Sequence, residues 1–120
     1  MSKTRPILPK TSYFELLLLL LRRRTRLKIV GRSMFPLLQP GNEILIDPYA
    51  YKKSLPKLND IVVTKHPQKP EITIVKRVTA IDGLQNYFLT GDNLADSTDS
   101  RHWGSVKSQD ILGKVTSHFC

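Results

Sequence analysis

The chain has 120 residues, of which 40% are hydrophobic and 24% are charged, so it can build one globular domain around a modest core. Six glycines and eight prolines in a chain of this hydrophobicity exclude a fibrous repeat and a wholly disordered protein. The single cysteine, Cys120, excludes an internal disulfide framework and a cysteine-rich zinc site, and it fits a reducing compartment.

The basic charge is concentrated at the N-terminus. Residues 1–28 carry +7 of the formal net charge of +9, whereas residues 29–120 carry only +2. A domain that follows a nucleic-acid backbone spreads its basic residues over the folded body. We therefore expect no nucleic-acid partner for the domain, and only the terminal segment could bind one.

The first predicted element is a helix that runs from Tyr13 to Arg24 or Thr25. Ser12 and Glu15 have the spacing of a capping box, in which the two side chains satisfy backbone amides of the first turn. Residues 16–21 are all leucine, and the arginines after them complement the negative end of the helix dipole. The run is too short to span a bilayer, and no small-residue cleavage site of a secretory signal follows it.

Leucines cover every side of this helix, so it must bury most of its surface. It either docks against the domain or a partner chain, or dips into an anionic membrane surface.

After Thr25 the hydrophobic pattern changes from helical to alternating, which predicts short strands separated by turns. No second long helix is predicted, so we expect a mainly β fold whose antiparallel sheet closes, or nearly closes, into a barrel-like core. Two units are expected: a basic N-terminal segment with the leucine-rich helix, residues 1–26, and a β domain, residues 27–120. The expected strands are Arg26–Val30, Glu43–Asp47, Asp60–Lys65, Glu71–Ile81, Tyr87–Thr90 and Ile111–Phe119.

The long strand from Glu71 to Ile81 carries a lysine on its apolar face. Its even positions are apolar except for Lys76, whereas its odd positions, which include Arg77, are mostly polar. Such a lysine either extends past the sheet edge into water, or is desolvated so that its pKa falls and the amine can act as a base. The pattern alone leaves both interpretations open.

A base needs a nucleophile, and the turn after the first strand contains Ser33, two residues beyond Gly31. Most serines in turns only form local hydrogen bonds, so this residue alone is a weak indication of catalysis. The three histidines, His66, His102 and His118, show neither a catalytic triad nor zinc-ligand spacing, and we expect them to be structural or exposed.

Four motifs, in order along the chain, resemble those of type I signal peptidases. Any one of them is weak, but four in the same order, covering roughly residues 27–119, are specific. The resemblance implies the β catalytic core shared by signal peptidases and LexA-type proteins. The motifs are Gly31-x-Ser33-Met34-x-Pro36, Asp60-Ile61-Val62-Val63, Val75-Lys76-Arg77-Val78 and Gly91-Asp92-Asn93-x-x-x-Ser97-x-Asp99-Ser100-Arg101-x-x-Gly104, and a closing strand, Ile111-Leu112-Gly113-Lys114-Val115, follows them.

Within that superfamily, the short chain, the missing anchor and the leucines followed by arginines are most similar to the nickel-type superoxide dismutase maturation proteases. The resemblance implies a bacterial, cytoplasmic serine endopeptidase that removes the N-terminal propeptide of a nickel superoxide dismutase precursor. It implies no cofactor and no metal in this chain. Because such a substrate is cytoplasmic, contact of the helix with a membrane surface is not favoured.

The resemblance also implies a role for each matching residue. A Ser–Lys dyad needs a neutral, buried amine to take the proton of the hydroxyl nucleophile. The expected roles are Ser33 as nucleophile, Lys76 as general base, Ser97 as the hydroxyl that holds the lysine amine, Asp99 and Arg101 as a pair that fixes the loop, and Asp92 and Asn93 as structural turn residues.

Two departures from the signal peptidase pattern stand out. Gly31 occupies the position where many of these enzymes carry a hydroxyl that serves as a second oxyanion donor. Ile81-Asp82-Gly83 replaces the Pro-Gly-Asp that commonly follows the lysine motif, so the accessory β domain of larger signal peptidases is expected to be absent.

Three alternatives stay open. The runner-up is a signal peptidase or organelle inner-membrane peptidase that cleaves the leader peptides of exported proteins, which would need a partner to reach them without a spanning helix. LexA-type repressors use a similar core, but about 26 residues before the first strand are too few for a three-helix DNA-binding domain. A non-enzymatic β-barrel binding module is the third.

Overall fold

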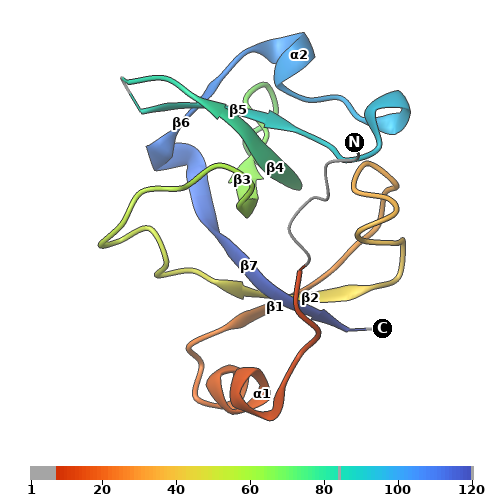
Figure 1. Cartoon of the computed structure of the whole chain (residues 1–120), viewed down its shortest axis with the longest axis vertical. Coiled ribbons are helices and arrows are strands. Elements are labelled where there is room, and N and C mark those ends of the chain that lie inside the picture. The colour runs from red at the N-terminus through yellow and green to blue at the C-terminus, as the bar shows by residue number, and fades with distance from the viewer. Residues whose placement is uncertain (1–7, 84, 120) are drawn as a thin grey trace, which may run out of the picture.

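The computed structural model describes residues 8–83 and 85–119, which fold around one antiparallel sheet of seven strands. The strands are β1 (Thr25–Lys28), β2 (Glu43–Asp47), β3 (Ile61–Lys65), β4 (Thr73–Ile81), β5 (Asn86–Thr90), β6 (Val106–Lys107) and β7 (Ile111–Phe119). Their order in the sheet is β1-β2-β7-β3-β4-β5-β6. The sheet curls, so that β1 and β2 lie towards one end of the molecule and β5 and β6 towards the other (Figure 1). The expected fold class, mainly β, antiparallel and barrel-like, is confirmed.

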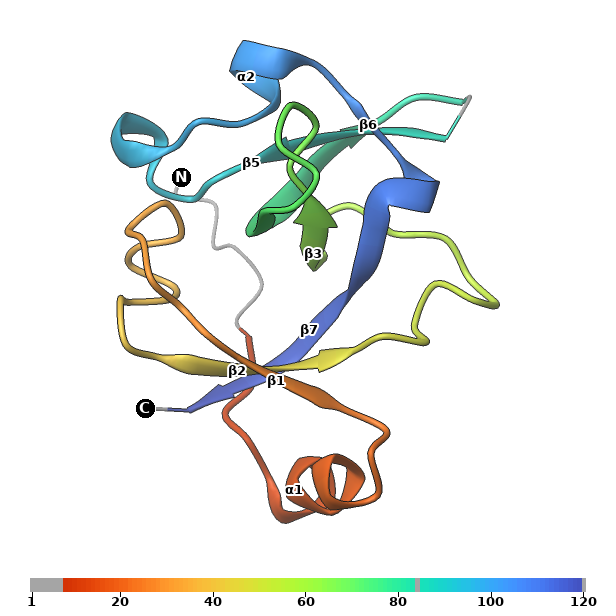
Figure 2. The same ribbon diagram turned by 180° about the vertical axis from the view of Figure 1, so that it is seen from behind.

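β3, the middle strand of the sheet, is buried on both faces by apolar side chains. Ile61 and Val63 belong to one hydrophobic cluster, and Val62 between them belongs to another. The first cluster includes Met34, from the turn after β1, and the second includes Tyr87 from β5. We call these the β1–β2 half and the β5–β6 half, and Figure 2 shows β7 running from one towards the other.

The strands follow the predictions closely, with small differences at their ends. Glu43–Asp47 and Ile111–Phe119 begin and end where expected. The first strand ends at Lys28, because Ile29 already bonds to Gly41 and Asn42 in the loop before β2. β4 begins at Thr73, because the amide and carbonyl of Ile72 close the preceding turn with Lys69 and His66.

Between the two last expected strands, Tyr87–Thr90 and Ile111–Phe119, lie short elements that the sequence did not predict. These are the 3₁₀ turns η1 (Leu94–Asp96) and η2 (Ser108–Asp110), the short helix α2 (Ser100–Trp103), and β6. Asp99 caps α2 by accepting a hydrogen bond from the amide of Arg101, and His102 completes a capping box. One turn of helix is too short for a periodic pattern, so only its cap could have indicated it.

The N-terminal helix α1 spans Tyr13–Leu20 and is shorter than predicted. Ser12 caps it as expected, accepting a hydrogen bond from the amide of Glu15. The helix ends early because Arg22 adopts a left-handed backbone conformation. The amides of Arg22 and Arg23 then bond to the carbonyls of Leu19 and Leu18, which is the pattern of a Schellman motif.

Of the alternatives left open for the leucines of α1, burial against the domain is not what the described residues show. None of the residues of α1 is buried. The side of the helix that faces the sheet carries Glu15, which bonds to Arg24 and to Thr116 of β7. A polar contact therefore attaches the inner side of the helix to the sheet, and the leucines of the opposite side face away from the domain.

Candidate active site

Lys76 lies in the middle of β4, and its side chain is only 4% exposed. Its Nζ donates a hydrogen bond to Ser97 Oγ at 3.0 Å. Burial lowers the pKa of Lys76, and the guanidinium of Arg101 adds to this, although the nearby Asp99 carboxylate partly opposes both. Of the two interpretations of this lysine, the desolvated amine is the one that the structure has.

Ser97 connects the lysine to a buried carboxylate. Its Oγ donates to Asp99 Oδ2 at 2.6 Å, and the same oxygen of Asp99 accepts the amide of Gly91 at 2.9 Å. Because the hydroxyl hydrogen of Ser97 points to Asp99, its oxygen is left to accept from Lys76. Lys76, Ser97 and Asp99 therefore form one directed chain of hydrogen bonds.

Arg101 holds the carboxylate from the other side. Its Nε lies 2.9 Å from Asp99 Oδ1, and its terminal nitrogen also bonds to the carbonyls of Leu94 and Ser97. Burial alone would raise the pKa of Asp99, but the hydrogen bonds from Arg101, Ser97 and Gly91 outweigh it and lower the pKa well below its ordinary range. Asp99 is therefore an anion that orients Ser97.

Ser33 lies in the turn after β1, and the loop after β5 fixes this turn. The amide of Asn93 donates to the carbonyl of Ser33 at 2.8 Å, and its side-chain nitrogen donates to the carbonyl of Arg32 at 3.1 Å. Gly91 allows this approach, since a Cβ there would lie 2.5 Å from the Ser33 carbonyl oxygen and would overlap Ser97. Asn93, expected to be only a structural turn residue, directly holds the turn that carries Ser33.

Arg77 is a residue of the site region whose role the sequence analysis missed. It points to the opposite face of β4 from Lys76, yet it is almost completely buried. Two of its guanidinium nitrogens bond to the two carboxylate oxygens of Asp92 at 2.8 and 2.9 Å, and a third bonds to the carbonyl of Asn59. The pair joins β4 to the loop that holds both Ser33 and Lys76. In the sequence its only signal was its place beside Lys76 in the long strand, on the face expected to be polar.

Ser33 and Lys76 line the same groove, which has a volume of about 340 Å³. The groove runs between the end of β1 and the first half of β4, and Gly31 lies at its edge. A Cβ at Gly31 would meet no atom within 4 Å, so a side chain has room there. The lining residues are Leu27, Lys28, Ile29, Val30, Gly31, Ser33, Met34, Thr73, Ile74, Val75 and Lys76.

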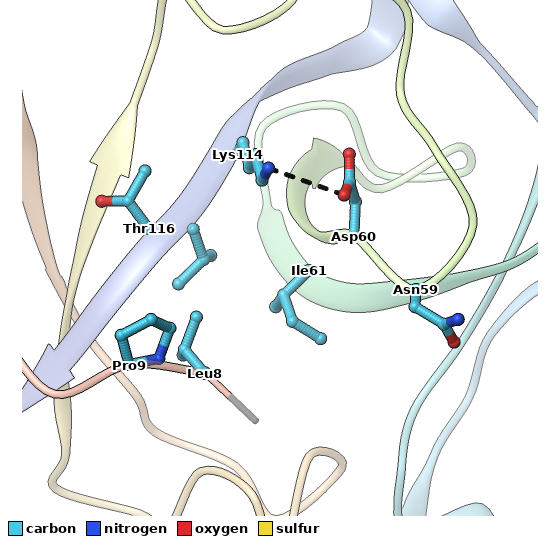
Figure 3. Close-up of a pocket in the computed structure, with 8 residues that line it drawn as sticks. Leu8, Pro9, Asn59, Asp60, Ile61, Lys114 and Thr116 are labelled. Carbon is cyan, nitrogen blue, oxygen red and sulfur yellow. Dashed lines mark ion pairs between the residues drawn. The ribbon is translucent and has the colours of Figure 1, made fainter. Parts of the chain in front are cut away.

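A second cavity, of about 300 Å³, contains none of the residues predicted to be catalytic (Figure 3). Its polar part is an ion pair in which Lys114 Nζ lies 3.7 Å from Asp60 Oδ1. Tyr51 donates a hydrogen bond to the other oxygen of this carboxylate. The acid and the base of this cavity are paired with each other, so we assign it no chemistry.

Comparison with known proteins agrees with this geometry. Residues 12–85 and 84–120 match the family described as "Signal peptidase, peptidase S26". The chain is 31% identical over 107 residues to the mitochondrial ATP-independent inner membrane protease subunit 1b of Arabidopsis thaliana, covering 71% of this chain and 63% of that protein. It is 31% identical over 104 residues to the mitochondrial inner membrane protease subunit 1 of Xenopus tropicalis, covering 71% of this chain and 62% of that protein. It is also 35% identical over 65 residues to a signal peptidase I of Buchnera aphidicola, covering 54% and 19%.

The chain thus matches less than two thirds of the length of these inner membrane proteases. No helix in the described residues is long and apolar enough to cross a membrane. None of these relatives is named as a processing enzyme of a superoxide dismutase, so the comparisons support the broader of the two resemblances. The match over almost the whole chain makes it a member of the signal peptidase family, peptidase S26.

Proposed function

We propose that the chain is a serine endopeptidase that removes leader peptides, with Ser33 as nucleophile and Lys76 as general base. One observation carries this proposal: Ser33 and a buried lysine of lowered pKa line the same groove. An exposed lysine would be protonated at neutral pH and could not take a proton, whereas a desolvated one can.

The hydrogen bonds of Lys76 suit a base that receives a proton from the groove. Its amine donates to Ser97, whose own hydrogen is committed to Asp99. In the neutral amine one lone pair is then left to accept the proton of Ser33 Oγ. Ser97 and Asp99 thereby fix the direction in which Lys76 accepts.

The reaction would proceed in two halves. Lys76 takes the proton of Ser33 while Oγ attacks the scissile carbonyl, and the tetrahedral intermediate then breaks its C–N bond as the lysine ammonium protonates the leaving amine. In the second half, Lys76 deprotonates a water that attacks the acyl-serine ester, and the proton returns to Ser33 as the C–O bond breaks. The amide of Ser33 supplies one donor to the oxyanion, and Gly31 supplies no side-chain donor.

The groove suits an extended peptide. β1 pairs only with β2 among the described strands, and β4 pairs with β5 only from Arg77 onwards. The backbone of β1 and that of residues 73–75 of β4 therefore border the groove as open strand edges. A substrate strand could hydrogen-bond along these edges while its carbonyl lies beside Ser33.

Two substrate classes fit such a groove, and the named relatives favour one. The relatives are inner membrane proteases and signal peptidases, and their names favour leader peptides of exported or membrane-sorted proteins as the substrate. That the substrate is the precursor of a nickel superoxide dismutase, cleaved in the cytoplasm, stays a hypothesis. It rests only on the short chain and the leucine-rich helix. The division into residues 1–26 and 27–120 is likewise a proposal.

Incubation of the protein with two peptides distinguishes between these two substrate classes. One peptide carries an apolar segment followed by an A-x-A site, and the other spans the propeptide junction of a nickel superoxide dismutase precursor. We expect cleavage of the leader peptide at one bond, located from the masses of both products. Cleavage of the second peptide alone would favour the narrower substrate.

Ser33→Ala is the control for the chemistry. It should abolish cleavage of either peptide while the free energy of unfolding changes by no more than about 1 kcal/mol, since one turn hydroxyl is lost. Residual activity within about tenfold of the unmodified chain would rule out Ser33 as the nucleophile.

A further inference from the structure

The outer side of α1 is a continuous apolar surface. Tyr13, Leu17 and Leu20 follow one another at helical spacing and are 92%, 49% and 78% exposed. Phe14 and Leu21 lie beside them and are also largely exposed. Figure 1 shows α1 at the extreme end of the molecule, beyond β1 and β2. An apolar surface of this kind on the described part of the chain indicates a binding partner.

Polar contacts on the inner side hold α1 in this orientation. Arg24 bonds to both carboxylate oxygens of Glu15 and lies 3.6 Å from Asp47 of β2. Thr116 of β7 donates to Glu15 as well. The hydrogen bonds from Thr116 and Arg24 outweigh the effect of burial and lower the pKa of Glu15, so this carboxylate is charged. Turning the helix to bury its leucines would break this network.

The exposed charges that flank α1 along the chain are all positive. Glu15 is the only acidic residue in residues 1–42, and it faces inwards. Arg22 and Arg23 are exposed at the C-terminal end of α1, and Lys10 is exposed before its N-terminus. The guanidinium of Arg23 also lies 6.0 Å from the ring of Tyr49, a further exposed aromatic residue. Aromatic and aliphatic side chains flanked by arginines are the chemistry that anionic lipid surfaces bind.

We propose that α1 lies in the headgroup region of an anionic lipid bilayer and holds the protein at the membrane surface. Its eight residues reach only about 12 Å, so the helix lies in the surface rather than crossing it. A second copy of the chain is a poorer occupant, because in a symmetric contact through α1 the arginines at the end of one helix would meet either the arginines or Lys10 of the other, which are like charges. This proposal does not depend on the proposed peptidase activity.

Co-sedimentation with vesicles of equimolar phosphatidylcholine and phosphatidylserine tests the proposal on the full chain. We expect binding that weakens as salt is raised, and much weaker binding to phosphatidylcholine alone. The double variant Leu17→Gln, Leu20→Gln keeps the helix propensity of leucine and should lower the affinity by about tenfold or more. Arg22→Asn with Arg23→Gln, where asparagine tolerates the left-handed backbone, should lower it about tenfold and reduce the salt dependence.

Matched control variants lie in the loop between β2 and β3. Leu55 and Leu58 are 52% and 57% exposed, and Lys52 and Lys53 are exposed beside them. Leu55→Gln with Leu58→Gln, and Lys52→Gln with Lys53→Gln, should leave binding within about twofold of the unmodified chain.

Three results would overturn the proposal: no binding to the anionic vesicles, equal loss of binding in the control variants, or a dimer in sedimentation velocity that the α1 leucine variant converts to a monomer. Ser33→Ala should bind vesicles as the unmodified chain does, so a failure of the peptidase proposal would leave this test unaffected.

Discussion

The state of one amine determines what this site can do. Burial lowers the pKa of Lys76 below the ordinary 10.5, and the proposed mechanism uses only the neutral form. The neutral fraction grows as the pH rises through the lowered pKa. We therefore expect kcat/KM to rise with pH through that value and then to level off, as measured by peptide cleavage in buffers of constant ionic strength.

Lys76→Arg tests directly whether cleavage needs a neutral amine at this position. Arginine keeps the positive charge but stays protonated at every working pH, so the variant should be as inactive as Lys76→Ala. An arginine variant that cleaves well would make Lys76 an electrostatic or structural residue. A rate that falls with rising pH would contradict the assignment of the base.

Gly31 allows a prediction of gained activity. A Cβ there has no neighbour within 4 Å, and the residue borders the groove two positions before Ser33. A hydroxyl at this position could donate to the oxyanion, so Gly31→Ser should raise kcat by up to about tenfold with little change in KM. Gly31→Ala is the control, and an equal gain there would show that backbone stiffening, not a hydrogen bond, is responsible.

At the scale of elements, the loop after β5 depends on one carboxylate. Asp99 is fully buried, caps α2 and accepts hydrogen bonds from Ser97, Gly91 and Arg101. Asp99→Ala leaves these donors without an acceptor, so we expect a loss of about 3 kcal/mol in the free energy of unfolding by urea. The exposed Glu71 is the matched control, and Glu71→Ala should cost less than about 0.5 kcal/mol.

The same carboxylate predicts a pH dependence of stability. The pKa of Asp99 is lowered by folding, so the unfolded chain binds its proton first and the stabilisation is lost as the pH falls below the ordinary value of 3.8. The difference in stability between the unmodified chain and Asp99→Ala should therefore narrow in acid. A difference that is constant with pH would mean that Asp99 acts only through packing.

The sequence predicts the longer elements well because their patterns are local. Alternation gives β2 and β7 their observed ends, and Ser12 gives the start of α1. By contrast, α2 and β6 have four and two residues, and they depend on distant partners such as the bond from the amide of Leu89 to Ser100. Contacts of this kind lie outside any local pattern, which is why the sequence did not predict these elements.

For the candidate site, the motifs predict which residues are involved but not how they are held. Ser33, Lys76 and Ser97 follow from the resemblance to signal peptidases, and the structure brings the last two into contact. The pairing of Arg77 with Asp92 joins residues 15 positions apart through the fold, so no spacing rule predicts it. The sequence also could not predict which side of α1 faces outwards. Six consecutive leucines cover every side of the helix, and its orientation depends on the contacts of Glu15 with Arg24 and Thr116.

At the scale of the whole molecule, the site forms where the two halves meet. Ser33 belongs to the turn between β1 and β2, packed by Met34 into the first core cluster. Lys76 and Ser97 belong to β4 and to the loop after β5. Asn93 bridges the two groups, since its amide and side chain hold the carbonyls of Ser33 and Arg32. The distance between Ser33 and Lys76 therefore depends on contacts between the halves, whereas stability depends on the core of each half.

This separation predicts a variant that loses activity without losing its fold. Asn93→Ala removes the side-chain hydrogen bonds to the carbonyl of Arg32 and to the carboxylate of Asp96 but leaves both core clusters intact, so the melting temperature should fall by only a few degrees. Small displacements of a nucleophile are costly to catalysis, and we expect kcat/KM to fall by about tenfold to a hundredfold. Asn86→Ala is the control, because this variant likewise removes an asparagine side chain that bonds to an aspartate, Asp82, but in the hairpin between β4 and β5. It should change stability similarly and leave the rate of cleavage unchanged. Equal losses of activity in the two variants would show that the contact between the halves does not position Ser33.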